Sequence, residues 1–213
     1  MIKESEADNM KETYVISINR EFGSMGRPIA KKISEILGIE YYDRDIVDKT
    51  AKKMNKPIST VSNNEEKAKG SGYWSMKFPL GTQASEEQDQ IFRVQREIML
   101  DLAKKGNCIM VGRCSDYVLD EFKNHLKIYI YAPVNKRYDN CVNSLMMNPD
   151  DARKMIRDVD KARNAYHMRY AGYKPGSLEH NNILVDSSVL GVDKTAENLA
   201  QYIQAWISGL DKA

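Results

Sequence analysis

The sequence is poor in cysteine, has no long apolar run and shows no excess of one charge. Only three of its 213 residues are cysteine, an odd number without CxxC spacing, which argues against a disulfide framework or zinc site and fits a reducing cytoplasm. No stretch approaches the roughly 20 apolar residues of a membrane helix. The 32 basic and 30 acidic residues leave a net charge of +2, too little to attract nucleic acid or an anionic membrane. We therefore expect a soluble cytoplasmic protein without membrane or nucleic-acid partners.

The order of elements along the chain predicts one α/β domain. Short β-rich runs are found at residues 14–18, 39–42, 108–112, 126–132 and 182–188. Helical patterns alternate with them, at residues 27–38, 43–54, 86–105, 149–170 and 193–210. Parallel neighbours need crossover connections, so this alternation predicts a three-layer fold with a central, mostly parallel five-stranded sheet flanked by helices. Ligands bind such sheets beyond the carboxyl ends of the strands.

Residues 55–90 interrupt this alternation. They are rich in Asn, Ser, Gly, Lys and Glu and show little apolar period. A segment of this length inside a compact domain is either disordered or a functional lid. Tyr73, Trp74 and Phe78 would give a lid apolar side chains for docking, so both interpretations stay open.

The loop after the first β-rich run is a candidate anion site. Its residues are Gly23, Ser24, Met25, Gly26 and Arg27, directly before or at the start of a helix. Glycines let backbone N–H groups approach a ligand, the helix start adds partial positive charge, and an arginine supplies a bidentate fork. The loop therefore suits phosphate, although a plain turn beside a surface arginine would have the same signature.

The helix predicted over residues 149–170 carries a row of charged side chains. The row consists of Arg153, Arg157, Asp160 and Arg163. At about 100° per residue they fall on one face, with three guanidinium groups around one carboxylate. Like charges packed in this way repel one another unless an anion binds, so the face is either an anion-binding surface or a solvated charged face.

Two further candidates stand at the ends of β-rich runs, where such a sheet binds ligands. Arg113 follows residues 108–112, and Asp43 follows residues 39–42. Each also has a simpler explanation. Arg113 could be a surface arginine paired with Asp116, and Asp43 could be the N-cap of the helix that it precedes.

Several segments together resemble the bacterial cytidylate kinase-like family, a branch of the P-loop nucleoside monophosphate kinases. They are INREFGSMGRPIAKKISEILGIEYYDRDIV, IMVGRCSDYVL, KIYIYAP, DVDKARNAYHMRYAGYKPG and ILVDSS, spread from about residue 13 to the C-terminal helix. The resemblance implies a single kinase-like domain over residues 1–213, with a mobile acceptor-binding or lid-like insert near 55–90 and a lid helix near 149–170. It also implies ATP-dependent phosphoryl transfer to a nucleoside monophosphate, CMP or dCMP, with ATP and Mg²⁺ as cofactors and small-molecule nucleotides as partners.

The same resemblance assigns roles to the candidate residues. Gly23, Ser24, Met25, Gly26 and Arg27 would hold the donor phosphates, and Asp43, Arg113 and Asp160 would bind the acceptor. The catalytic arginines would be Arg27, Arg153, Arg157 and Arg163, which stabilise the charge on the phosphoryl group in transit.

The loop departs from the P-loop pattern GxxxxGK[ST] at three of its four defined positions. Aligned on Gly26, the chain has Glu21 at the first glycine, Arg27 at the lysine and Pro28 at the Ser/Thr that holds Mg²⁺. Arginine can replace the charge of the lysine, but proline offers no oxygen, so Ser24 or Asp43 would have to assist the metal. Two alternatives therefore stay open: a nucleotide- or anion-binding module without transferase activity, and a kinase for another small metabolite.

Overall fold

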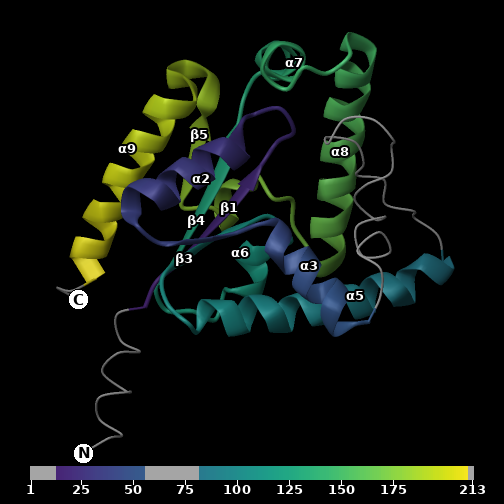
Figure 1. The fold of residues 1–213 in the computed structure, drawn as a ribbon, viewed down its shortest axis with the longest axis vertical. Helices are drawn as coiled ribbons and strands as arrows, with labels where there is room; N and C mark the ends of the chain where they lie inside the picture. Colours follow the sequence, from purple (N-terminus) through teal and green to yellow (C-terminus); the bar gives the residue numbers. More distant parts are fainter. Residues whose placement is uncertain (1–12, 56–81, 211–213) are drawn as a thin grey trace, which may run out of the picture.

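The computed structural model describes residues 13–55 and 82–210, with five strands in one sheet (Figure 1). The strands are β1 (Val15–Arg20), β2 (Glu40–Tyr42), β3 (Cys108–Val111), β4 (His125–Tyr131) and β5 (Ile183–Asp186). Their order across the sheet is β2-β3-β1-β4-β5, and every neighbouring pair is parallel. The carboxyl ends of these strands therefore share one edge. This confirms the five-stranded parallel α/β architecture that the sequence predicts.

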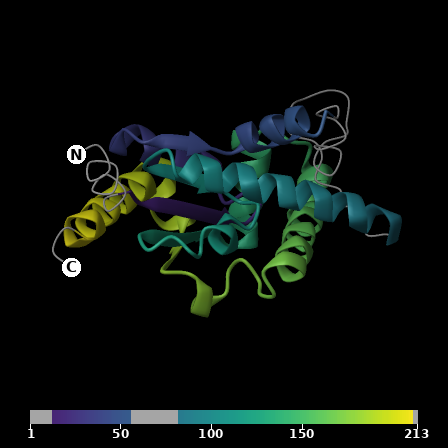
Figure 2. The same cartoon turned by 90° about the horizontal axis from the view of Figure 1, so that it is seen from below.

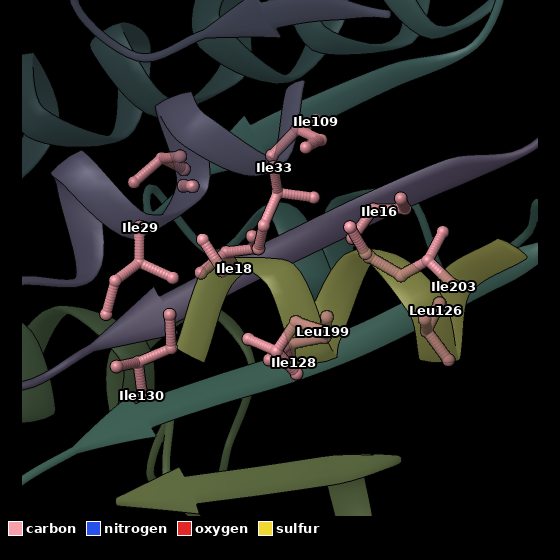
Figure 3. Close-up of a cluster of buried hydrophobic side chains, with 14 of the residues drawn as sticks. Ile16, Ile18, Ile29, Ile33, Ile109, Leu126, Ile128, Ile130, Leu199 and Ile203 are labelled. Carbon is pink, nitrogen blue, oxygen red and sulfur yellow. The ribbon is translucent and has the colours of Figure 1, made fainter. Parts of the chain in front are cut away.

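One face of the sheet is covered by α2 (Gly26–Leu37) and α9 (Ser187–Leu210). Both helices have an apolar stripe at helical spacing, which packs onto alternate residues of β1, β3 and β4 (Figure 3). Ile29 and Ile33 of α2 and Ile203 of α9 are fully buried. Burial of each such side chain stabilises the fold by about 1.5–3 kcal/mol. Gly38, in the left-handed conformation, ends α2 as predicted.

The other face is covered by α3 (Arg44–Lys53), α5 (Thr82–Ala103) and the short α6 (Ser115–Val118). Met99 and Leu102 of α5 pack there against Cys108 and Met110 of β3. Residues 82–90, which the sequence groups with the polar segment, form the first turns of α5. The predictions made for residues 56–81 lie outside the described residues.

Beyond β4 the chain forms α7 (Val134–Asp139), the π-helical turn η1 (Asn140–Ser144) and then α8 (Pro149–Tyr170). Asn148 caps α8, because its side chain accepts a hydrogen bond from the backbone N–H of Asp150 at 3.0 Å. The other end of α8 packs on α5 through the stacked rings of Phe92 and Tyr170 (Figures 1 and 2). A 3-10 turn, η2 (Leu178–His180), then leads to β5. None of the helices in the described part of the chain combines the length and apolar content needed to cross a membrane.

Candidate functional site

The loop between β1 and α2 folds against residues from distant parts of the chain. Ser24 is fully buried, and its hydroxyl contacts the backbone oxygens of Glu21 and Ile130 at 2.9 and 3.1 Å. Gly23 has a φ of 79°, and a Cβ there would come within 2.8 Å of the backbone oxygen of Arg137. The loop thus follows a path that only glycine permits at position 23.

The start of α2 leaves backbone N–H groups available to a ligand. The first helical hydrogen bond runs from Ile29 to the backbone oxygen of Met25 at 3.1 Å. The N–H groups of Gly26 and Arg27 have no acceptor among residues 13–55 and 82–210. The N–H of Phe22, in contrast, donates to Asp160 Oδ1 at 2.8 Å. The helix start is therefore open to an anion, while the beginning of the loop is occupied by a carboxylate of the protein itself.

Arg137 of α7 joins two carboxylates beside this loop. Its Nη1 donates to Asp160 Oδ2, and its Nε lies 3.3 Å from Glu21 Oε2. Burial raises the pKa of Glu21, while the N–H of Ala132 and the charge of Arg137 oppose that rise. We call Glu21, Asp160 and Arg137 the balanced group, because Arg137 pairs with both half-buried carboxylates and Arg163 of α8, 3.9 Å from Asp160, supplies the second positive charge.

Four arginines gather at the carboxyl edge of the sheet. They are Arg20 at the end of β1, Arg27 at the start of α2, Arg113 after β3 and Arg163 on α8, and we call them the arginine cluster. Asp43 pairs with Arg27, whose Nε lies 2.6 Å from its Oδ2 and whose Nη2 donates to its Oδ1 at 3.1 Å. Its charge also acts on Arg20 and Arg113, whereas Arg163 lies 3.9 Å from Asp160. Asp43 occupies the predicted N-cap position of α3, but its side chain makes no cap hydrogen bond and is bound by Arg27 instead.

The arginine cluster carries more positive charge than its surroundings neutralise. Burial, with a smaller contribution from the neighbouring arginines, lowers the pKa of Arg20 and of Arg113 to about 10, because the charged form loses its hydration; the charge of Asp43 opposes this fall. Burial also lowers the pKa of Arg163. The Nε atoms of Arg20 and Arg163 are buried without a hydrogen-bond partner among the described residues. Such an arrangement is stabilised when an anion binds.

Arg20 fits into the cluster because two glycines make room for it. A Cβ at Gly26 would lie 2.6 Å from the Cβ of Arg20, and one at Gly112 would lie 2.1 Å from its Nη1. Arg20 and Arg137 were not predicted from the sequence. Arg20 is the last residue of a buried strand, and Arg137 belongs to a short helix in a part of the chain for which no element was predicted.

The turn that carries Arg113 has an unusual backbone. Gly112, Arg113 and Cys114 have consecutive positive φ values of 73°, 58° and 54°. The left-handed conformation costs about 1–3 kcal/mol for a residue with a side chain, so it persists only where neighbouring contacts impose it. The turn places Arg113 where the charge of Asp43 supports its guanidinium group.

The charged row on α8 differs from the predicted arrangement. Arg163 reaches the loop, where its Nη1 donates to the backbone oxygen of Arg20 at 2.8 Å. Arg153, however, has a 62% exposed side chain that pairs with Asp150, and Arg157 is also exposed. The helical period shows that these residues lie on the same side of the helix axis, but residues on one side can still be far apart along the axis. Arg153 lies seven residues before Asp160, a rise of about 10 Å. The place beside Asp160 that was expected for Arg153 is taken by Arg137.

The described residues fit polyphosphate better than they fit a metal. The hydroxyl of Ser24 already contacts two backbone oxygens, and Asp43 is bound by Arg27 and lies 3.5 Å from the hydroxyl of Tyr41. No group of three or more His, Cys, Asp or Glu side chains that could hold a metal ion occurs in the described part of the chain. Neither residue that was expected to assist Mg²⁺ thus presents a free oxygen to it.

Comparison with known proteins identifies the family. The model of the cytidylate kinase-like family matches residues 15–189, which is more than half of the chain. An uncharacterized protein from Eubacterium ventriosum ATCC 27560 superposes with a TM-score of 0.67 at 22% identity, over 90% of this chain and 98% of that one. No curated protein matched the sequence.

Two shikimate kinases share the fold at lower identity. The one from Acinetobacter baumannii, solved in complex with shikimate, has a TM-score of 0.52 at 13% identity, over 93% of this chain and 97% of that one. The one from Bacteroides thetaiotaomicron has a TM-score of 0.55 at 9% identity, over 92% and 99%. These likenesses establish a P-loop kinase-like fold. With the match over residues 15–189, they lead to one conclusion: the chain belongs to the cytidylate kinase-like family.

Proposed function

We propose that this protein is an ATP-dependent phosphotransferase that acts on a nucleoside monophosphate, with CMP or dCMP as the first candidate acceptor. The observation that supports the proposal best is the arginine cluster. Three guanidinium groups, those of Arg20, Arg27 and Arg113, act on Asp43 at the ligand-binding edge of the sheet, beside the open start of α2. The charges of Arg20 and Arg27 also act on Arg163. The phosphates of a donor and an acceptor would supply the missing negative charge.

The residues divide into a donor side and an acceptor side. Residues 23–27 would hold the donor phosphates through the N–H groups at the start of α2 and the charge of Arg27. Asp43 and Arg113 would bind the acceptor, with Arg20 beside them and Asp160 acting through Arg137. Arg163 would contact the phosphoryl group in transit. Such chemistry requires mainly positioning and charge, which arginines provide without covalent catalysis.

The roles proposed for Arg153 and Arg157 require movement. Both side chains are exposed, so they would reach the transferred group only if α8 closed over the loop as a lid. Mg²⁺, when bound, neutralises part of the phosphate charge. It would be held mainly by the nucleotide and by water, because Pro28 has no side-chain oxygen and Ser24 is occupied.

One observation favours a second candidate, a binding module without transferase activity. The N–H of Phe22 is bound by Asp160, and the position of the metal-binding hydroxyl is occupied by Pro28. A third candidate, a kinase for another small metabolite, follows from the chemistry of the cluster, because guanidinium groups bind carboxylates as well as phosphates. Shikimate, the ligand of one structural neighbour, is therefore a reasonable acceptor to test.

The deciding experiment is an ADP-release assay with Mg-ATP and a panel of acceptors. The panel contains CMP, dCMP, the other nucleoside monophosphates, shikimate and small hydroxy acids. Turnover of CMP or dCMP supports the proposal, and turnover of only a non-nucleotide supports the metabolite kinase. Saturable ATP binding without any turnover supports the binding module. Arg163→Met and the matched control Lys161→Met, an exposed cation on the same helix, show whether turnover depends on the cluster.

A further inference from the structure

A buried ion pair joins the region after β3 to helix α8. Asp116 of α6 and His167 of α8 are 1% and 3% exposed, and Nε2 of His167 lies 2.9 Å from Oδ1 of Asp116. The other carboxylate oxygen accepts a hydrogen bond from the hydroxyl of Tyr173 at 3.1 Å. The proposed phosphoryl transfer gives this pair no role.

Each ring nitrogen of His167 faces an oxygen. Its Nδ1 lies 2.9 Å from the backbone oxygen of Tyr173, which can only accept a hydrogen bond. Its Nε2 lies 2.9 Å from Oδ1 of Asp116. Burial raises the pKa of that carboxyl, but hydrogen bonds from His167, Asn19 and Tyr173 hold it below its usual value. A ring protonated on both nitrogens would donate to both oxygens, and Asp116 would neutralise its charge.

Each partner lies next to a part of the arginine cluster. Asp116 stands two residues after the left-handed turn of Gly112, Arg113 and Cys114, a backbone that needs support from its neighbours. His167 stands one helical turn beyond Arg163, on the same face of α8. The ion pair thus connects the turn that positions Arg113 to the helix that positions Arg163.

We propose that Asp116 and His167 are positioning residues that hold Arg113 and Arg163 in the geometry that binds an anion, and that loss of the His167 proton releases this geometry. A neutral ring can donate to only one of its two acceptors. If it turns away from Asp116, it leaves a buried carboxylate without its counter-ion. The strained turn beside Asp116 then relaxes and withdraws Arg113. The inference rests on the proposed function only in taking the arginine cluster as the anion site.

Several other titratable or charged groups lie around the pair. Those that face it or its partners are Tyr173, His180, Cys114, Asp120 and His125, with Lys127 beside His125. Burial raises the pKa values of Tyr173 and Cys114. Burial also lowers the pKa of His125 to about 4, so its ring is neutral at pH 7. Of the three histidines in the sequence, His180 is therefore the necessary control.

Two measurements on the full-length chain test the proposal. Imidazole ¹H–¹⁵N spectra from pH 6 to 10 follow the protonation of each of the three rings. The expected result is that both nitrogens of His167 carry a proton at pH 7. Calorimetry with inorganic pyrophosphate over the same range should show affinity falling about tenfold, the effect of losing one hydrogen bond to a charged group. The fall should have the same midpoint as the His167 titration.

Variants separate this transition from the ionisation of pyrophosphate. His180→Gln should keep the transition, and His167→Gln should abolish it and bind weakly throughout. A neutral His167 ring at pH 7, or an unchanged transition in His167→Gln, would overturn the proposal. If His167→Gln does not fold, the wild-type and His180→Gln data decide. The proposal is supported if the His167 titration and the fall in pyrophosphate affinity have the same midpoint, and it is contradicted if the two midpoints differ.

The outcome is distinguishable from that of the proposed function. Coincident midpoints without phosphorylation of any acceptor would support the positioning pair and contradict the transferase. Absence of pyrophosphate binding at every pH would overturn the pair together with the anion site. The ADP-release assay would then judge the transferase separately.

Discussion

Two groups of charged residues flank the loop between β1 and α2, and they differ in how their charges balance. In the balanced group one buried arginine, Arg137, lies between the carboxylates of Glu21 and Asp160. In the arginine cluster the proportion is reversed, because Arg20, Arg27 and Arg113 share Asp43, while Arg163 lies 3.9 Å from Asp160. The first group has a counter-charge for each carboxylate, whereas the second has more guanidinium groups than carboxylates and is stabilised by an anion. Charge balance thus distinguishes a structural support from a binding site where residue type alone does not.

The largest expected effect is on the balanced group. Arg137→Met would leave Glu21 without its counter-ion and Asp160 with only Arg163, at 3.9 Å, and breaking a buried pair in this way costs about 3 kcal/mol of unfolding free energy. Urea denaturation at pH 7 measures this loss. The control Lys136→Met, at an exposed neighbouring position, should change stability by about 0.5 kcal/mol or less. Equal losses in the two variants would contradict the supporting role.

The next effect should separate binding from stability. Arg163→Met keeps the apolar stem but removes one charge from the arginine cluster, so affinity for ATP should fall by about 10- to 100-fold, the range for hydrogen bonds to charged groups. Its unfolding free energy should change less than that of Arg137→Met, because one repelling charge is removed as well. Calorimetry and urea denaturation on the same samples make the comparison. A variant that loses stability but keeps ATP affinity would place Arg163 among the supports.

The sequence predicted the sheet and part of its binding edge for a physical reason. The strand at 108–112 is buried on both faces and is a nearly continuous apolar run, and the strand at 126–132 alternates buried Leu and Ile with partly exposed residues, so both patterns are visible in the sequence alone. Parallel strands place their carboxyl ends together, so Asp43 and Arg113 were expected at one edge. In the structure the charge of Asp43 raises the pKa of Arg113 against burial, which shows that the two residues are close.

The rest of the site could not be predicted because it depends on contacts between distant segments. The room for Arg20 is made by Gly26 and Gly112, which lie on either side of it only in the folded chain. The pairing of Arg137 with Asp160 joins α7 to α8, and α7 is too short and too polar to show a helical period. A charged residue at a strand end or in a short helix has the same sequence pattern whether it binds a ligand or faces solvent.

The pH dependence of the unfolding free energy tests whether Asp43 belongs to the arginine cluster. Burial raises the pKa of this carboxyl, but Arg20, Arg27 and Arg113 hold it below its usual value of 3.8. A carboxyl with a lowered pKa stabilises the folded state above its unfolded pKa, and that contribution is lost as the pH falls through and below 3.8. The unfolding free energy of Asp43→Asn should therefore depend less steeply on pH in this range. Exposed Asp150→Asn should follow the wild type, and equal slopes for all three proteins would remove Asp43 from the cluster.

The smallest effect is expected for a substitution of Arg153, which tests whether the exposed end of α8 contributes to phosphoryl transfer. Because this side chain is exposed and its partner Asp150 is almost fully exposed, Arg153→Ala should change stability by about 0.5 kcal/mol or less. It should also leave ATP affinity unchanged in the absence of acceptor, since Arg153 takes no part in the arginine cluster. Turnover responds differently if α8 closes over both substrates, because the arginine then meets a phosphate and its loss lowers kcat more than it raises KM. Steady-state kinetics with the acceptor identified by ADP release, with exposed Lys154→Ala as control, measures this split. Identical kcat values in the two variants would show that the exposed end of α8 takes no part in transfer, and that the buried end, with Arg163, carries the whole contribution of this helix.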